Sequence, residues 1–290
     1  MASQVERYPE QREAFYTAES DLSHPAKLFQ QMWRDLLASR ELAWQLMARD
    51  IKAQYRQSLF GVAWAFLPPI AVAAGFTLAS QAKIINVGVT DLPYPAYVLF
   101  STALWHTFVE ALHAPLQGVS AAKPMLARIN FPREAIILAK LGEVIFNFLV
   151  KSVLIAAAFV WFQVPVRATA LLAPVALLHL IALGTCLGLL LAPLGSLYQD
   201  VGRAVAVLVG FWFFLTPVIY PVPSGGIFRL IVKLNPVTPL LVTTRELATT
   251  GIVSSPWSFA AVSASAFIGL LLAWVIYRLA MPFVIERMSS

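Results

Sequence analysis

The amino-acid sequence predicts an all-α membrane protein with about six transmembrane helices, and three observations support this prediction. Of the 290 residues, 59% are hydrophobic and only 12% are charged, whereas a typical soluble domain carries about 25% charged residues. Long apolar stretches follow one another between residues 58 and 280, and residues 1–58 hold eight of the 15 acidic residues. A soluble fold could not cover so much apolar surface, so we expect a polar head followed by a membrane domain.

The polar head divides into two parts. Residues 1–30 are rich in acidic side chains and lack the apolar stretch of a cleaved secretion signal. Between residues 31 and 57, apolar side chains recur at helical spacing with charged ones between them, which predicts an amphipathic helix. We expect this helix to lie in the cytoplasmic interface of the membrane with Trp33 and Trp44 as anchors. Packing against a soluble partner is the alternative.

The membrane domain, residues 58–280, contains about six stretches long enough to cross a bilayer. The connection between the second and third stretches carries Lys123, Arg128 and Arg133, and the connections on either side of it carry fewer basic residues. The positive-inside rule therefore places residues 121–134, both termini and a short tail at 281–290 in the cytoplasm. The expected spans are 59–80, 96–120, 135–162, 171–193, 203–221 and 257–280.

The last outer connection, residues 222–256, is too apolar for a plain loop. It also carries more basic residues than the positive-inside rule expects of an outer connection. Two short apolar segments meet there at Asn235-Pro236, and neither can cross about 30 Å of hydrocarbon alone. We expect a re-entrant helical hairpin on the outer side, between spans five and six, because protein can bury irregular backbone at membrane depth. The alternative is a single span, which would place the C-terminus outside.

Several ionisable side chains fall inside the expected spans. His106, Glu110 and His113 lie on one face of the second span, and Glu143 and Lys151 lie in the third. Ionisable groups in a membrane are functional candidates, and a proton relay is one interpretation. A structural Glu–Lys pair between packed helices, or residues bordering a wet channel, is the other.

Catalytic and metal-binding patterns are sparse. Cys186 is the single cysteine, so we expect neither a disulfide framework nor a Cys/His metal site. The spans carry no repeated carboxylate pair and no nucleophile elbow, so we do not expect an enzyme. Basic residues that flank membrane spans explain the net charge of +6 without nucleic acid as a partner.

Three motifs in order carry a resemblance to a known family. Residues 49–68 read RDIKAQYRQSLFGVAWAFLP, residues 123–134 read KPMLARINFPRE, and residues 213–221 read FFLTPVIYP, followed by NPVTP at 235–239. This series resembles the ABC-2 type permeases that export polysaccharides and polyol phosphates, the family of O-antigen, capsule and teichoic-acid exporters. The resemblance covers roughly residues 45–280.

The resemblance implies a homodimer with six spans per subunit, bound to two separate ABC ATPase subunits. The chain has no Gly-Lys pair and hence no Walker loop, so ATP and Mg are expected on the partner and no cofactor on this chain. The resemblance also implies roles for four sets of residues. They are coupling to the ATPase (Lys123, Met125, Leu126, Arg128, Phe131, Pro132, Arg133), lipid head-group binding at an inner gate (Arg49, Lys52, Tyr55, Arg56), a glycan channel (Trp64, Phe211, Trp212, Phe214, Tyr220) and an outer gate hairpin (Asn235, Pro236, Pro239).

Each set has a plainer interpretation as well: a positively charged inner loop, membrane anchoring, or an interfacial aromatic belt. The expected function is the permease subunit of an exporter for a lipid-linked polysaccharide in the bacterial cytoplasmic (inner) membrane. The first alternative is an ABC-2 exporter of drugs or small amphiphiles. The second is an ion-coupled carrier that uses Glu110, Glu143 and Lys151.

Overall fold

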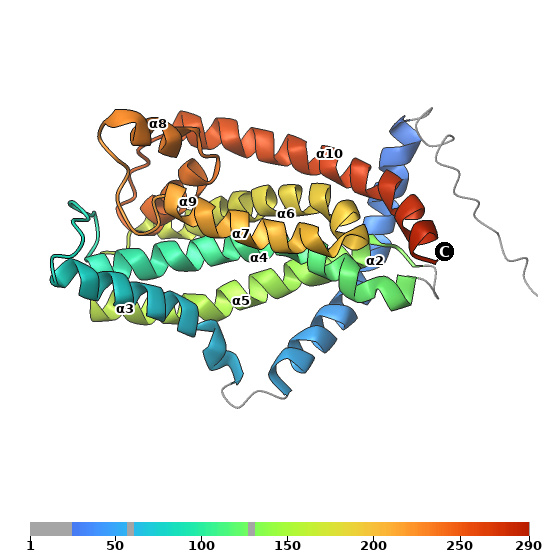
Figure 1. The fold of residues 1–290 in the computed structure, drawn as a ribbon, viewed down its shortest axis with the longest axis horizontal. Helices are drawn as coiled ribbons and strands as arrows, with labels where there is room; N and C mark the ends of the chain where they lie inside the picture. Colours follow the sequence, from blue (N-terminus) through green and yellow to red (C-terminus); the bar gives the residue numbers. More distant parts are fainter. Residues whose placement is uncertain (1–24, 57–60, 127–130, 290) are drawn as a thin grey trace, which may run out of the picture.

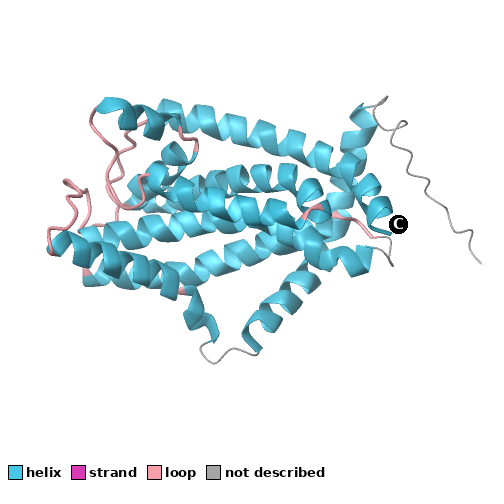
Figure 2. Ribbon diagram, in the orientation of Figure 1, coloured by secondary structure: helices cyan, strands magenta, loops and turns pink. Residues whose placement is uncertain are grey.

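The computed structural model describes residues 25–56, 61–126 and 131–289, and within these ranges helices are the only regular structure (Figure 2). The predicted all-α class is therefore confirmed. The helices are α2 (Pro25–Arg56), η1 (Gly61–Ala65), α3 (Leu67–Gln81), α4 (Tyr94–Leu126), α5 (Glu134–Trp161), η2 (Ala168–Leu172), α6 (Ala173–Leu197), α7 (Gln199–Leu215), α8 (Gly226–Leu234), α9 (Val237–Ala248) and α10 (Pro256–Ser289).

Helices α3 to α7 and α10 run along the long axis of the molecule, and successive ones point in opposite directions (Figure 1). Helix α2 crosses one end of this bundle, where the chain also ends, and the α8–α9 pair lies at the other. We call these the α2 end and the hairpin end.

Three helical segments are long and apolar enough to cross a membrane: Glu134–Trp161, Ala168–Leu197 and Pro256–Arg287. The α8–α9 pair passes the same test only as a unit bent by 85°, so it is either a broken span or a re-entrant loop. Helices α3 and α7 have 15 and 17 residues. At 1.5 Å per residue they reach about 22 and 26 Å, short of the ~30 Å hydrocarbon core. The count of six spans therefore stays a prediction.

Prolines explain why α3 and α7 are shorter than the expected spans 59–80 and 203–221. Helix α3 begins only at Leu67 because prolines follow in its first turn, where their missing N–H groups are harmless. Helix α7 ends at Leu215 since the residue before Pro217 is disfavoured in the helical conformation. The predicted interface helix at 31–57 corresponds to α2, and α10 extends through most of the expected tail.

The centre of the bundle is the seam between α4 and α6. Gly184 and Gly188 are spaced as in the small-xxx-small pattern of tightly packed membrane helices. A Cβ atom on Gly184 would lie 2.7 Å from the carbonyl oxygen of Phe108, and one on Gly188 would overlap that of Leu112. The two backbones therefore approach closely, and α6 is the most enclosed of the three apolar segments.

Candidate functional site

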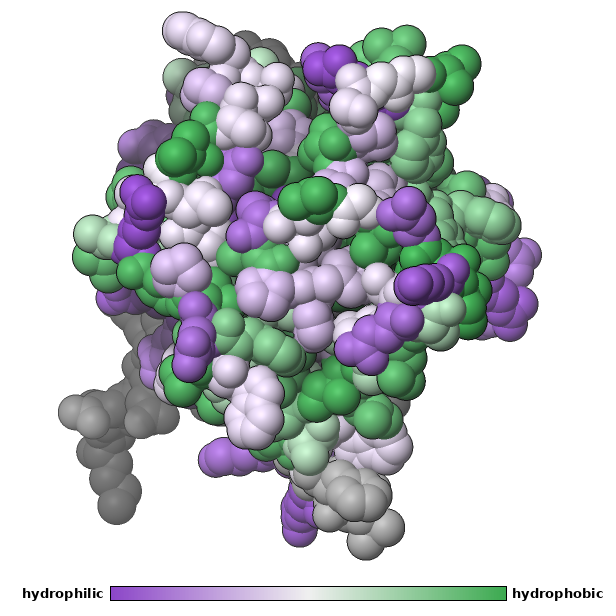
Figure 3. Space-filling model, turned by 90° about the vertical axis from the view of Figure 1, so that its left-hand side faces the viewer, coloured by the Kyte–Doolittle hydropathy of each residue, from purple (hydrophilic) through white to green (hydrophobic). Residues whose placement is uncertain are grey.

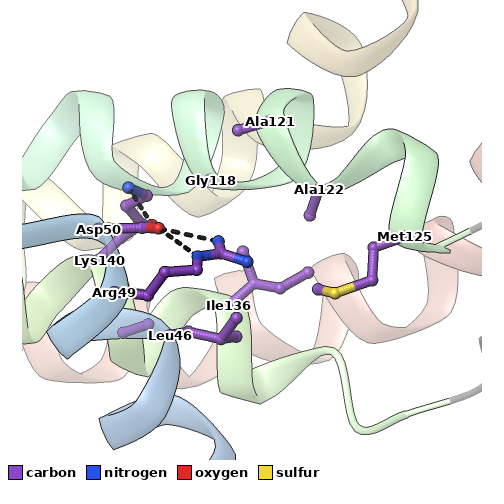
Figure 4. Close-up of a pocket in the computed structure, with 10 residues that line it drawn as sticks. Leu46, Arg49, Asp50, Gly118, Ala121, Ala122, Met125, Ile136 and Lys140 are labelled. Carbon is purple, nitrogen blue, oxygen red and sulfur yellow. Dashed lines mark hydrogen bonds and ion pairs between the residues drawn. The ribbon is translucent and has the colours of Figure 1, made fainter. Parts of the chain in front are cut away.

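Two groups of ion pairs attach α2 to the bundle. In the first, Lys140 Nζ on α5 donates to Asp50 Oδ2 at 2.9 Å and to Glu143 Oε1 at 2.7 Å, and Arg49 also pairs with Asp50 (Figure 4). Burial alone would raise the pKa of the Asp50 carboxyl, but hydrogen bonds and charge from Lys140 and Arg49 outweigh it. The pKa of Asp50 therefore lies below its ordinary value.

The second group is centred on Arg278 of α10. Its guanidinium contacts Asp35 of α2 at 2.7 Å and Glu134, the first residue of α5, at 3.1 Å. Arg278 and Glu134 are both largely buried. One arginine thus joins three helices, and α2 is held at both of its halves.

The expected coupling segment lies beside these ion pairs. Met125 at the end of α4 and Phe131 pack against a small core that includes Ala43 and Leu46 of α2, so they face α2. Lys123, Pro132 and Arg133 are partly exposed, and Leu126 is the last residue of α4. Arg128 lies outside the described residues. The segment thus connects mechanically to α2, whereas its contact with a partner stays a prediction.

The expected head-group residues do not behave alike. Arg49 pairs with Asp50 beside a small cavity of about 70 Å³ between α2, α4 and α5 (Figure 4). Lys52 and Arg56 are exposed on the second half of α2, and Tyr55 belongs to the same helix. Arg49 is exposed as well, but its guanidinium is engaged by Asp50, so Lys52 and Arg56 are better placed to meet an anionic ligand.

At the hairpin end, Asn235 joins two predicted sets. Its Oδ1 accepts from Trp212 Nε1 and from the backbone N–H of Val237, both at 3.0 Å. Its Nδ2 donates to the backbone oxygen of Leu215 at 3.2 Å and to Thr216 Oγ1 at 2.8 Å. The expected gate residue therefore fixes the end of α7 to the α8–α9 junction, where Pro236 directly precedes α9 and Pro239 is buried in its first turn.

The sequence analysis missed Arg245 as a structural residue. Its side chain is 4% exposed, lies over the ring of Tyr97 at 4.1 Å and donates to Ser101 Oγ at 2.9 Å. Tyr97 in turn donates to the backbone oxygen of Tyr220 at 2.8 Å. Arg245 is thus buried in protein, which explains why its charge in the 222–256 connection did not fit the positive-inside rule.

The hairpin end itself is of mixed character. Figure 3 looks onto this end and shows hydrophilic and hydrophobic side chains interspersed over its face. The short helix α8 exposes Ile227 and Leu234. An end that displays both kinds of side chain suits the boundary between lipid and water.

The five expected channel aromatics separate into two groups. Phe211, Phe214 and Trp64 are 69%, 56% and 54% exposed. Trp212 instead packs edge-on against Trp105 and Phe108 in the core. Tyr220 donates its hydroxyl to the backbone oxygen of Phe214 and contacts the ring of Phe228. Phe211 and Phe214 are available to lipid, substrate or a second subunit, whereas Trp212 and Tyr220 hold the fold.

The carboxylates and lysines inside the bundle are paired. Lys151 on α5 donates to Glu110 Oε1 on α4 at 2.6 Å, and Glu143 pairs with Lys140 one turn away. This arrangement fits the structural pair between packed helices that was one of the two interpretations. The Glu110–Lys151 pair also borders a cavity of about 190 Å³. Among the described residues, no cluster of three or more His, Cys, Asp or Glu side chains is arranged to hold a metal ion.

Comparison with known proteins agrees with the three motifs. Residues 41–249 match the family described as ABC-2 type transporter. A protein of Myxococcus xanthus named O-antigen export system permease protein RfbA is 25% identical over 72% of this chain and 80% of its own length. Proteins of the same name from Klebsiella pneumoniae are 23% and 21% identical over 71% and 78% of this chain and 79% and 86% of their own lengths. Because the family match covers well over half of the chain, the protein is a multi-pass membrane permease that belongs to the ABC-2 type transporter family.

Proposed function

We propose that this chain is the membrane subunit of an ATP-driven exporter that moves a lipid-linked polysaccharide across the bacterial cytoplasmic membrane. The observation that carries the proposal is the alignment with most of the length of proteins named as permeases of O-antigen export systems. The exposed aromatic residues Phe211 and Phe214 support it, because rings offer flat faces on which sugars can slide.

The proposed assembly contains two copies of this chain and two ABC ATPase subunits that hold ATP and Mg. Each copy crosses the membrane six times through α3, α4, α5, α6, α7 and α10, with α8–α9 as a re-entrant hairpin. The α2 end and both termini face the cytoplasm. Support comes from the alternating direction of these helices and from α2, which lies across one end as an interface helix would.

In the proposed cycle, the anionic head group of the lipid anchor binds at the α2 end through Lys52 and Arg56. The polymer passes between the two copies along Trp64, Phe211 and Phe214. Closure of the ATPases acts on the 121–134 segment, and the packing of Met125 and Phe131 against α2 transmits that motion.

The first experiment is purification of the tagged chain in mild detergent after expression in its own host. Copurification of an ATPase in equal amount, together with loss of surface polysaccharide when the gene is deleted, supports the proposal. An ATPase without any effect on polysaccharide indicates an exporter of small amphiphiles. If the permease stays dimeric and no ATPase accompanies it, an ion-coupled carrier replaces the proposal.

A second experiment tests the coupling segment. In the double variant Lys123→Ala/Arg133→Ala we expect ATP hydrolysis to continue while export stops. Lys233→Ala is the matched control, because it removes an exposed cation at the hairpin end. Normal export in the double variant would overturn the assignment of the coupling surface.

A further inference from the structure

A cavity of about 190 Å³ that is open to the outside lies between the helices and has both polar and apolar lining. It is lined by side chains from four parts of the chain, the second half of α2, the η1–α3 region, α4 and α5. Glu110 is halfway along α4, far from both ends of that helix. Charged and polar side chains in the middle of an apolar bundle are functional candidates, because they are costly there unless they meet a partner, a ligand or water. Its polar, charged and aromatic lining consists of Gln54, Trp64, His106, Glu110, Asn147 and Lys151.

The charged part of the lining is an ion pair with unused hydrogen-bonding capacity. Lys151 is 3% exposed and donates to Glu110 Oε1 at 2.6 Å. The other carboxylate oxygen of Glu110 is enclosed and has no hydrogen-bond partner among the described residues. An enclosed charged oxygen without a partner destabilises the protein. A small rotation of the carboxylate would let a donor in the cavity satisfy it.

The neutral part of the lining has open capacity too. In the portion of the chain that the structure describes, no hydrogen bond engages the side chains of His106, Asn147 or Gln54. Each of them can donate or accept. Trp64 adds an aromatic face to the same lining and is about half exposed. The cavity therefore combines donors, acceptors and one flat apolar wall.

This combination selects for a neutral ligand. The charges of Glu110 and Lys151 cancel, so an anion in the cavity would meet the carboxylate and a cation would meet the ammonium. A polyhydroxyl ligand avoids both problems, because each hydroxyl group donates to one neighbour and accepts from another. The cavity has room for several water molecules, which is the scale of a single sugar ring.

We infer that this cavity is a binding site for one neutral sugar unit of the transported polymer. The inference rests on the proposed function and deepens it. A sugar unit places hydroxyl groups against Glu110 and Asn147 and its C–H face against Trp64. Phe211 and Phe214 of α7 do not line this cavity, so the site is a second place at which the chain senses its substrate.

The test uses a cysteine as a reporter of occupancy. In a Cys186→Ala background, Gln54→Cys places a thiol at the exposed rim of the cavity, and its reaction with neutral hydroxyethyl methanethiosulfonate is timed in membrane vesicles. The vesicles come from cells that make the polysaccharide and from cells in which its first glycosyl transfer is blocked. We expect labelling to be about tenfold slower when the polymer is present, the change that one good polar contact produces.

The variant that tests the lining is Asn147→Leu, which removes an amide of similar size without disturbing the ion pair. We expect it to abolish the protection by polymer while ATPase association is retained. The matched control Ser152→Ala removes a hydroxyl of the same helix that bonds only to the backbone oxygen of Leu149 and does not line the cavity. Protection in that variant should equal wild type.

The outcomes distinguish failure of the sugar site from failure of the proposed export function. If surface polysaccharide depends on the gene but labelling is the same with and without polymer, the cavity holds water only and this inference is wrong. If surface polysaccharide does not depend on the gene, the proposed function is wrong. Unchanged protection in Asn147→Leu would also overturn the sugar site, because the lining amide would then contribute nothing.

Discussion

The two ends of the bundle are held together by different chemistry. At the α2 end, charged side chains pair with one another: Arg278 with Asp35 and Glu134, and Lys140 with Asp50. At the hairpin end, side chains bond mainly to backbone oxygens. Those acceptors are the last carbonyl of α7 and the carbonyls of the irregular segment that follows it. Asn235 donates to Leu215, Tyr97 donates to Pro217 and Tyr220, and Tyr94 donates to Ile219.

The difference follows from what each end must satisfy. Where α7 stops at Thr216-Pro217, carbonyl groups lose their helical partners, and in apolar surroundings each must find another donor. Asn235 supplies a donor to the last helical carbonyl, that of Leu215. Tyr94 and Tyr97 supply donors to carbonyls of the irregular segment that follows, and together these bonds fix the hairpin end. At the α2 end, ion pairs between side chains hold one helix across others. Apart from the largely buried pair of Arg278 and Glu134, these ion pairs are partly exposed, so salt weakens them more than it weakens the neutral bonds of the hairpin end.

The largest expected effect is at Arg278. Replacing it in Arg278→Met leaves Asp35 and the buried Glu134 without their shared cation, which should destabilise the protein by about 3–5 kcal/mol. Thermal unfolding in detergent measures the change. The control is Arg203→Met, whose partner Asp200 and own side chain are both exposed, and less than about 1 kcal/mol is expected there. Equal unfolding temperatures for the two variants would show that the buried cluster does not hold α2.

The next effect is at the hairpin end. Asn235→Leu removes four hydrogen bonds and leaves the Trp212 indole and the carbonyl of Leu215 without partners. We expect a loss of about 1–3 kcal/mol, independent of salt because the bonds are neutral. Asn86→Leu is the control, since its single bond to Gly88 is exposed. A salt-dependent loss in Asn235→Leu would contradict the comparison of the two ends.

Much of this division was predictable from the sequence, and some was not. The amphipathic helix, the 121–134 segment and the bent apolar pair at Asn235-Pro236 are all local patterns. The partners of Arg278 and Arg245 are not, because they come from helices far apart in the chain and no local period encodes them. Because those partners could not be predicted, Arg245 counted only as a basic residue of the 222–256 connection.

The glycine spacing in α6 was overlooked in the sequence, and two of the expected spans were predicted too long. Gly184 and Gly188 have the spacing of a close helix contact, and the α4–α6 seam uses them in that way. The expected first and fifth spans ran on through Pro68 and Pro217 because hydropathy averages over residues, whereas a proline ends or begins a helix at one position. The expected channel set was similarly mixed, since exposure depends on tertiary packing and separates Phe211 from Trp212.

Salt should also lower the stability of the α2 end relative to the hairpin end, by less than the two substitutions above. Raising the ionic strength to about 1 M shortens the screening length to about 3 Å, which weakens the partly exposed pairs of Asp35 and Asp50. We expect amide hydrogen exchange to become faster in α2 and to stay unchanged in α9, with an effect below about 1 kcal/mol. Faster exchange in both helices would mean that the ends open together.

The smallest expected effect is a pH dependence confined to the α2 end. Because contacts with Lys140 and Arg49 hold the pKa of Asp50 below its ordinary value, the folded state binds this proton less readily than the unfolded chain. The stabilisation by Asp50 is therefore complete above the ordinary value of about 3.9 and is lost as the pH falls through the lower, folded one.

Asp50→Asn removes this titration and should lower the stability at pH 7 by about 0.5 kcal/mol, within the range for partly exposed pairs. Between pH 7 and 5 the difference between wild type and Asp50→Asn should stay constant, and below about pH 4 it should shrink. Hydrogen exchange of α2 measures it, with the first turn of α9 as the internal reference because the neutral side chain of Asn235 holds that turn. A difference that shrank already between pH 7 and 5 would mean that Asp50 is protonated there, and the ion pair with Lys140 would not be what attaches α2 to α5.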